Sequence, residues 1–318
     1  MNQTTNTILM IRPVAFRMNE QTAVNNYYQK VLDNLTPATV NAKAQAEFDA
    51  YVEKLRSVGV NVVVVDDTLD PDTPDSIFPN NWISFHETGD VVLYPMFAEN
   101  RRLERREDVL DILEESGFQI NEIMDYTSAE EDNIFLEGTG SIILDRTNEI
   151  AYCALSPRAD EELFIEFCED FEYNPIIFEA FQTVEGERKH IYHTNVMMCI
   201  AETFAVICAD CIDDKAERKM VLESLKNSGK EIILITETQV NNFAGNMLQV
   251  RGTNDERFLV MSNAAYQALT KEQITKIEKH CKIVYASLDI IEACGGGSAR
   301  CMMAEVFLPM AEVFLPKS

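Results

Sequence analysis

The hydrophobic and polar positions of the chain repeat one local arrangement. Short apolar or alternating runs occur in pairs, and polar turn residues such as those at 87–90 and 145–148 separate the two runs of a pair. This pattern is typical of β-hairpins. Four hairpins are predicted in this way, at 83–94, 141–152, 196–208 and 247–261. They recur roughly every 50–60 residues, which indicates an array or a propeller.

An amphipathic helix and a short apolar strand follow each predicted hairpin. The helices are predicted at 103–115, 160–171, 214–227 and 271–280, and the strands at 119–123, 175–178, 231–235 and 283–286. The N-terminal part fits the same unit with a strand at 8–11, a helix at 38–58 and a strand at 62–65. Thr36-Pro37 is a suitable cap and first turn for that helix.

The fifth hairpin needs both ends of the chain. If the segment that contains Cys301 pairs with strand 8–11, the ring closes without a free edge or a linker. We therefore predict an α/β fold of five hairpin–helix–strand units around a central cavity. A single domain is expected to span residues 1–318.

Polar motifs precede the predicted hairpins. They occupy 75–81, 133–138, 190–195 and 241–246, and Cys301 stands at the fifth such place, after the glycines at 295–297. Repetition around an axis is expected to turn these five distant segments toward one cavity. Cysteine, histidine and glutamate in such a cavity are the parts of a nucleophilic hydrolase.

Composition and charge narrow the classes of partner. The chain has 318 residues, is 46% hydrophobic and carries a formal net charge of −26. Such a surface disfavours nucleic acid and anionic membranes. No stretch approaches the length of a membrane span, and the polar N-terminus has no secretory signal, so a cytoplasmic location is expected.

Eight cysteines without a signal peptide indicate reduced thiols. The pair Cys208 and Cys211 stands alone, with no further Cys or His at zinc spacing, and is expected to be structural. No metal and no cofactor are predicted. At the C-terminus, residues 310–316 repeat 303–309 perfectly, and this tandem copy is expected to pack loosely.

These motifs together resemble the guanidino-group-modifying enzymes, the pentein superfamily. GGGSARCM at 295–302 resembles the family's nucleophile motif, LEGTG at 136–140 its Glu-Gly-Gly-Asp motif, and DSIFPNN at 75–81 its Asp-x-x-Phe-x-Glu-Asp motif. The resemblance covers nearly the whole chain in the right order. It is strongest to the arginine-deiminase-related branch that includes citrulline-utilisation hydrolases, and it implies the pentein α/β propeller.

The resemblance implies roles for particular residues. Cys301 would be the nucleophile, activated at a helix start after the glycine turn, and His193 the general acid and base. His190 is a second candidate, whereas His86 and His280 are expected to be structural. Substrate nitrogen atoms would be bound by Glu137 and Asp75, with Phe78 in the same motif. An α-carboxylate would be held by Arg158 and by Arg101 or Arg102.

The sequence departs from the family pattern at three positions. Asn80, Asn81 and Asn195 stand where enzymes of cationic substrates often carry acids. Fewer carboxylates attract a guanidinium less, and amides suit a neutral urea group. We therefore expect a citrulline-like substrate, with an arginine-like one as the alternative, and release of ammonia through a covalent cysteine intermediate.

Two other functions are compatible with the same residues. An amidinotransferase would pass the amidino group to an amine instead of water, and a non-catalytic propeller would keep only the fold. A small guanidino or ureido amino acid is the expected partner, and the chain is expected to form a homodimer. Residues 14–19 follow the first strand and are a candidate lid over the cavity.

Overall fold

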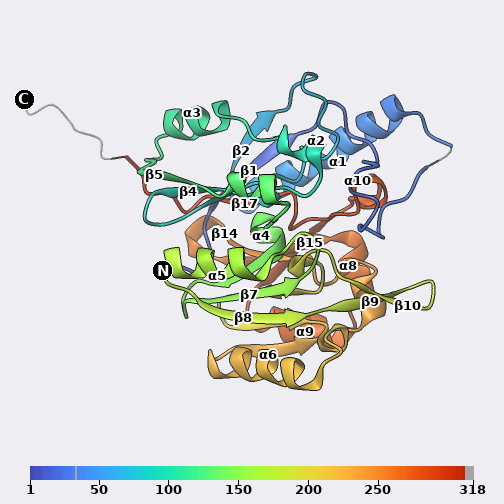
Figure 1. Ribbon diagram of the computed structural model, residues 1–318, viewed down its shortest axis with the longest axis vertical. Coiled ribbons are helices and arrows are strands. Elements are labelled where there is room, and N and C mark those ends of the chain that lie inside the picture. Colours follow the sequence, from blue (N-terminus) through green and yellow to red (C-terminus); the bar gives the residue numbers. More distant parts are fainter. Residues whose placement is uncertain (33, 312–318) are drawn as a thin grey trace, which may run out of the picture.

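The computed structural model describes residues 1–32 and 34–311. Over this part of the chain the strands form five three-stranded sheets and one two-stranded sheet (Figure 1). The three-stranded sheets, in spatial order, are β17 (Ala304–Glu305), β1 (Thr7–Arg12) and β2 (Asn61–Asp66); β3 (Ile83–Phe85), β4 (Asp90–Leu93) and β5 (Glu122–Asp125); β6 (Ile142–Asp145), β7 (Ile150–Leu155) and β8 (Asn174–Glu179); β11 (Met198–Ile200), β12 (Phe204–Ile207) and β13 (Glu231–Leu234); and β14 (Leu248–Arg251), β15 (Arg257–Ser262) and β16 (Lys282–Ala286).

All five sheets share one topology. The first two strands of each are antiparallel, and the third runs parallel to the middle strand. Parallel neighbours need a crossover connection, which a helix provides in every sheet. These helices are α1 (Pro37–Ser57), α3 (Asp108–Glu115), α5 (Glu161–Asp170), α6 (Lys215–Asn227) and α9 (Lys271–Glu278). The shorter ones are α2 (Glu99–Arg102), α4 (Gly138–Ser141), α7 (Glu237–Val240), α8 (Asn263–Ala268) and α10 (Asp289–Gly295).

The sheets surround a common axis as an α/β propeller, which confirms the predicted fold. The first strands of neighbouring sheets lie in contact, β17 with β3, β6 with β11, and β11 with β14. The two ends of the chain close the ring, because Ile8 pairs with Glu305 and Leu9 with Ala304. The predicted fifth hairpin between the Cys301 segment and strand 8–11 is therefore confirmed.

Local sequence signals determine where the helices begin. The Thr36 side chain accepts a hydrogen bond from the Thr39 amide, and Pro37 occupies the first turn of α1, as predicted. Asp160 and Asp214 cap α5 and α6 in the same way. Each cap provides a partner for backbone donors that the helix itself cannot satisfy.

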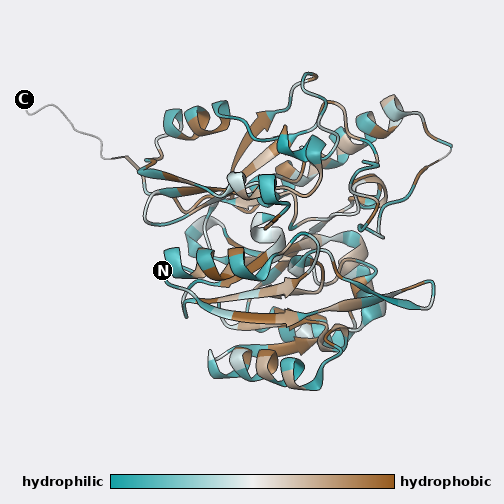
Figure 2. Ribbon diagram, in the orientation of Figure 1, coloured by the Kyte–Doolittle hydropathy of each residue, from teal (hydrophilic) through white to brown (hydrophobic). Residues whose placement is uncertain are grey.

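The core lies between the sheets and their helices. Figure 2 shows apolar strands in the interior and helices whose outer faces are hydrophilic. Tyr152, Phe178 and Phe204 are fully buried in one cluster, and Tyr51 and Phe48 of α1 in another. Full burial of such a side chain stabilises the fold by roughly 1.5–3 kcal/mol.

Three details differ from the predicted elements. The helix expected at 103–115 begins only at Asp108, as α3, and a turn separates it from the short helix α2, which lies before the predicted range. The strand expected at 119–123 begins only at Glu122, because the Gln119 amide donates to the Pro309 carbonyl in the C-terminal segment. The polar hairpin of β9 (Phe181–Val184) and β10 (Glu187–His190) was not predicted.

The two copies of the C-terminal heptad differ in their surroundings. In the first copy, Val306, Phe307 and Leu308 are buried. Of the second copy, Met310 is exposed and forms a bridge with Phe118, and the prediction for 312–316 falls outside the described residues. Within the described part of the chain, no helix combines the length and the apolar character that a membrane span requires.

Candidate active site

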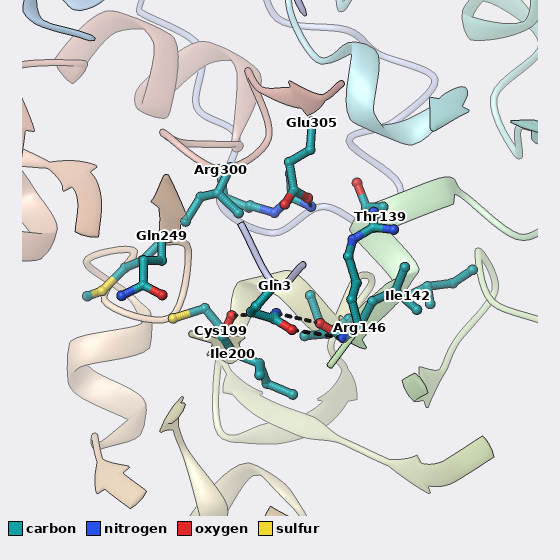
Figure 3. Close-up of a pocket in the computed structure, with 13 residues that line it drawn as sticks. Gln3, Thr139, Ile142, Arg146, Cys199, Ile200, Gln249, Arg300 and Glu305 are labelled. Carbon is teal, nitrogen blue, oxygen red and sulfur yellow. Dashed lines mark hydrogen bonds and ion pairs between the residues drawn. The ribbon is translucent and has the colours of Figure 1, made fainter. Parts of the chain in front are cut away.

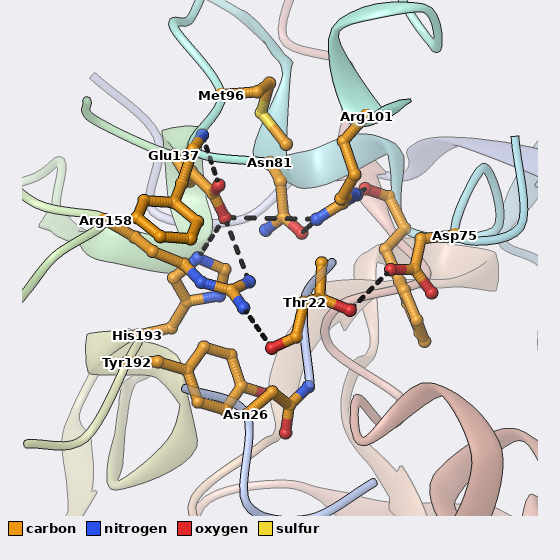
Figure 4. Close-up of polar contacts among 12 residues, drawn as sticks. Thr22, Asn26, Asp75, Asn81, Met96, Arg101, Glu137, Arg158, Tyr192 and His193 are labelled. Atoms are coloured by element: carbon orange, nitrogen blue, oxygen red, sulfur yellow. Dashed lines mark hydrogen bonds and ion pairs between the residues drawn. The ribbon is translucent and has the colours of Figure 1, made fainter. Parts of the chain in front are cut away.

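A small cavity lies where the segments before the inner strands converge on the axis (Figure 4). The space not filled by protein atoms there is about 260 Å³. The residues that line it come from all parts of the chain: Thr22, Asn26, Asp75, Phe78, Asn81, Arg101, Arg158, Tyr192, His193, Gly295, Gly297 and Cys301. The expected convergence of distant motifs is therefore present.

Cys301 lies in a tight turn between α10 and β17, and its side chain is buried at the cavity wall. Its backbone amide donates to the Ser298 carbonyl. Gly296 ends α10 in the left-handed conformation, with φ 62°, which glycine adopts without strain. No described helix begins at Cys301, so the expectation that a helix start activates the thiol is wrong.

Two amide groups contact the sulfur instead. Asn195 Nδ2 lies 3.5 Å and Asn246 Nδ2 lies 3.2 Å from Cys301 Sγ. Asn246 Oδ1 also accepts from the Arg300 amide, and Nδ2 donates to the Asn195 carbonyl. Two N–H donors favour a negative charge on sulfur over a neutral thiol. Asn246 was missed as a site residue, although it ends the polar segment 241–246 that the sequence pattern singles out.

His193 and Glu137 form a buried pair at the cavity. His193 Nε2 lies 2.7 Å from Glu137 Oε2, and both side chains are almost fully buried. Burial lowers the pKa of His193 to about 4, although Glu137 opposes this shift. Burial alone would raise the pKa of Glu137, but Arg158, His193 and Arg101 together hold it well below its usual value. At neutral pH the pair is thus a neutral imidazole beside a carboxylate.

The close packing of this pair requires a small residue in the LEGTG motif. A Cβ on Gly140 would lie 2.8 Å from His193 Nδ1 and 2.4 Å from Asn81 Nδ2. Glycine therefore allows α4 to approach the imidazole. The other oxygen of Glu137 accepts from the Phe97 amide at 3.0 Å. Hydrogen bonds from three directions fix the carboxylate in one position.

Arg158 and Arg101 both reach the cavity, and Arg102 does not line it. Arg158 Nη1 lies 3.4 Å from Glu137 Oε2, and its guanidinium lies 4.9 Å from the centre of the Tyr192 ring. Arg101 donates to Asn81 Oδ1 and to both oxygens of Glu104. Arg102 instead contacts the Met96 carbonyl and Glu130, and it is partly exposed.

Asp75 is the least satisfied acid of the cavity. Its Oδ2 accepts from Asn19 Nδ2 at 2.8 Å and from the Thr22 hydroxyl at 3.1 Å. Its Oδ1 is buried and has no partner among the described residues. Burial raises the pKa of Asp75, and Arg101 opposes this shift. An unpaired buried acceptor of this kind is a place for a donor of a bound ligand.

The remaining predicted residues divide between the cavity and its support. Phe78 and Asn81 line the cavity, and Asn195 contacts the sulfur. The fully buried Asn80 lies behind the cavity wall, where its side-chain amide contacts the Thr139 hydroxyl and donates to the Cys301 carbonyl. Its place is therefore beside the backbone of the nucleophile motif.

The segment between β1 and α1 covers one side of the cavity, but at later residues than predicted. Within 14–19, Asn19 donates to Asp75, and Phe16 packs in the same apolar cluster as Phe78 and Cys301. Thr22 and Asn26 line the cavity, and Asn25 accepts from Arg158. Figure 4 shows Thr22 between Asp75 and Arg158.

The other histidines lie outside the cavity. His86 is buried and stacks on Phe171, and His280 contacts Glu231, in keeping with structural roles. His190 ends β10 and packs on Phe181. Across the described residues, no group of three or more His, Cys, Asp or Glu side chains is placed to hold a metal ion.

Residues 12–308 match the family model of eukaryotic N,N dimethylarginine dimethylhydrolases. The chain belongs to this family. Members of this dimethylhydrolase family are hydrolases of guanidino compounds within the pentein superfamily. No curated protein matches the sequence significantly.

Several solved structures share the fold of this chain at low sequence identity. ArgZ, an arginine dihydrolase from the ornithine-ammonia cycle in cyanobacteria, matches with a TM-score of 0.73 and 17% identity over 98% of the chain. The chain spans only 41% of ArgZ. The N-terminal domain of ArgZ, as a cysteine-to-serine mutant bound to substrate, matches with a TM-score of 0.68 and 18% identity, covering 95% of this chain and 99% of that domain.

A dimethylarginine dimethylaminohydrolase, as an adduct with S-methyl-L-thiocitrulline, matches with a TM-score of 0.62 and 13% identity. The match covers 94% of this chain and 98% of that enzyme. These likenesses are at the level of the fold. They agree with the five-sheet propeller described above.

Proposed function

We propose that the protein is a cysteine-dependent hydrolase of a guanidino or ureido amino acid, with Cys301 as nucleophile and His193 and Glu137 as its acid–base pair. One observation carries this proposal. Cys301, with amide donors from Asn195 and Asn246 at its sulfur, and His193, bonded to Glu137, line the same cavity. A thiolate, a base and a carboxylate that orients the base are the parts of covalent catalysis.

The reaction begins with the transfer of a proton from the Cys301 thiol to His193. The imidazole is neutral at physiological pH, because burial lowers its pKa to about 4. Its Nε2 faces Glu137, so Nδ1 is the atom that accepts the proton. Glu137 stabilises the imidazolium that forms, and Asn195 and Asn246 stabilise the thiolate.

The thiolate then attacks the central carbon of the ureido group. A carbon–sulfur bond forms, the carbon–oxygen double bond opens to an oxyanion, and its collapse breaks the bond to the terminal nitrogen. His193 gives its proton to this nitrogen, which leaves as ammonia. The product of this step is an N-alkyl thiocarbamate on Cys301.

Water completes the cycle. His193 takes a proton from water, the resulting hydroxide attacks the thiocarbamate carbon, and the carbon–sulfur bond breaks to return Cys301 as a thiolate. The carbamic acid that leaves decomposes to an amine and carbon dioxide. With citrulline the products are ornithine, carbon dioxide and ammonia. A guanidino substrate follows the same steps with nitrogen in place of the carbonyl oxygen.

The charges of the cavity support an amino acid as the substrate. We propose that Arg158 and Arg101 hold its α-carboxylate, since a guanidinium matches a carboxylate with two parallel hydrogen bonds. Asp75 Oδ1, which has no described partner, is proposed to accept from the nitrogen of the ligand. Arg102 is not proposed to take part, because it contacts Glu130 outside the cavity.

A ureido group is the proposed preference over a guanidinium. Both oxygens of Glu137 are already engaged, by Phe97 and by the His193 and Arg158 side chains. Asp75 is then the one carboxylate of the cavity with an oxygen to offer. Asn81 at the cavity wall and Asn195 at the Cys301 sulfur supply neutral donors and acceptors. Arginine and N,N-dimethylarginine, which the similar proteins are named for, remain the competing substrates.

Ammonia and methylamines released from citrulline, arginine, agmatine and N,N-dimethylarginine test this proposal. Wild type is compared with Cys301→Ala and with Cys294→Ala, a matched control at a buried cysteine in α10. The proposal expects turnover of citrulline that disappears in Cys301→Ala and persists in Cys294→Ala. Robust turnover of arginine or dimethylarginine without citrulline would refute the ureido preference. Transfer of an amidino group to an added amine would favour the transferase.

A further inference from the structure

A second cavity lies on the axis of the propeller, among the inner strands (Figure 3). Its empty volume is about 410 Å³. Its walls come from β6, β11, β14 and β17, from the N-terminal residue Gln3 and from Arg146, Thr139 and Arg300. None of its described lining residues lines the cavity at Cys301. The proposed function uses no side chain of this second cavity.

Arg146 is the unusual residue of this axial cavity. Its side chain lines the cavity and only 3% of the residue is exposed. No carboxylate of the described residues lies within 4.0 Å of its guanidinium, and the polar partner of its side chain is the neutral Tyr173 hydroxyl. The ring of Phe307 covers one face, with its centre 4.0 Å from the guanidinium carbon. Buried charges in proteins are as a rule paired, because the loss of water is costly.

A second guanidinium, that of Arg300, lines the same cavity. Figure 3 shows the Arg300 side chain extending to Glu305 and the Arg146 side chain ending near Thr139. Arg300 donates to Glu305 Oε2 at 2.9 Å and to the Met303 carbonyl at 2.8 Å. One carboxylate therefore accompanies two guanidinium groups. The cavity carries a net positive charge inside a chain of net charge −26.

The N-terminal segment holds the backbone of Arg146 in place. Gln3 Oε1 accepts from the Arg146 amide at 2.8 Å, and Gln3 Nε2 donates to the Leu144 carbonyl at 2.9 Å. The side chain of Arg146 is thus fixed at its base, while its charged end remains without a carboxylate. A positioned, buried cation with open N–H donors is an anion site.

We propose that the axial cavity binds a small oxyanion, carboxylate or phosphate, between Arg146 and Arg300. Both ligand types offer oxygen atoms that match the planar N–H groups of arginine. The ligand neutralises the excess charge of the two guanidinium groups. It binds independently of the substrate at Cys301, so the site stands whether or not the proposed reaction does.

Thermal unfolding with inorganic phosphate or malonate, against chloride at matched ionic strength, tests the proposal. A ligand that binds only the folded state raises the Tm by about 2–4 °C at ten times its Kd. We expect a saturable rise of this size in the wild type and its loss in Arg146→Met. Whether phosphate, malonate or both raise the Tm identifies the kind of oxyanion that binds.

Two further variants locate the site. Arg158→Met removes an arginine of the cavity at Cys301, and Arg188→Met removes a partly exposed arginine that pairs with Asp213 and Glu237. Both are expected to keep the response. If Arg146→Met does not fold, Arg300→Met takes its place. The proposal is wrong if neither anion gives a saturable rise in the wild type, if the rise persists without Arg146, or if it depends on Arg158.

Discussion

The contact between Asn246 and the sulfur makes a sharp prediction about reactivity. The change Asn246→Asp keeps the oxygen that accepts from the Arg300 amide but replaces the donor 3.2 Å from Cys301 Sγ by an acceptor. Loss of one hydrogen bond to a charged group costs about 1.5–3 kcal/mol. At about 1.4 kcal/mol per factor of ten, kcat/KM should fall by roughly 10–150-fold, and repulsion by the new carboxylate adds to this.

Two assays separate this effect from a general loss of structure. Ammonia release gives kcat/KM, and alkylation by iodoacetamide across pH reports how readily the thiolate forms. The midpoint of alkylation should move to higher pH in Asn246→Asp, with the Tm measured in parallel. Asn242→Asp adds the same charge at an exposed position of the same segment and should behave as wild type. An unchanged alkylation profile and unchanged kcat/KM in Asn246→Asp would refute the proposed role of the amide.

Three further predictions concern ionisable residues. His193 must be neutral to accept the thiol proton, so kcat/KM should fall as pH decreases through about 4. Glu137→Gln should move this fall to lower pH, because Glu137 opposes the lowering of the His193 pKa. An unmoved pH profile in that variant would contradict the assignment. Asp75→Asn should reduce kcat/KM more for arginine than for citrulline, since only the guanidinium loses an ion pair; equal losses would count against the recognition argument. Burial raises the pKa of Glu292 from 4.5 to about 7, so the native state keeps a proton there that the unfolded chain releases, and the free energy of unfolding falls as pH rises from 4.5 to 7. In urea unfolding, Glu292→Gln should remove about 3 kcal/mol of this decline. An unchanged pH dependence in the variant would show that Glu292 does not cause it.

The repeated hairpin–helix–strand pattern was sufficient to predict the ring. Its strands are short and apolar, and turn residues mark each boundary, so local sequence and fold agree. The closure of the ring was also predictable, since strand 8–11 lacked a hairpin partner elsewhere. The β9–β10 hairpin was not, because the strand 187–190 is polar throughout and gives no alternating signal.

The cavity residues were predictable only where a motif marks them. Cys301, His193 and Glu137 lie in such motifs, and the fold brings Cys301 and His193 to one cavity, with Glu137 bonded to His193. Asn246 has an ordinary polar context, and its contact with the sulfur arises from the meeting of two distant units. The choice between Arg101 and Arg102 depends on the short helix α2, whose direction the pattern of residues does not reveal. Thr22 and Asn26 lie in a segment without periodicity.

The joint between β1 and β17 has a consequence for how activity is lost. It consists of two residue pairs, supported by the bond from the Val306 amide to the Thr7 carbonyl. Cys301 stands three residues before this joint, while the other four sheets are complete without it. A local opening at the joint would displace the nucleophile and leave most of the core intact. Inactivation in mild denaturant should then precede the loss of the helical circular dichroism signal. Enzyme activity would therefore report whether β1 and β17 remain paired.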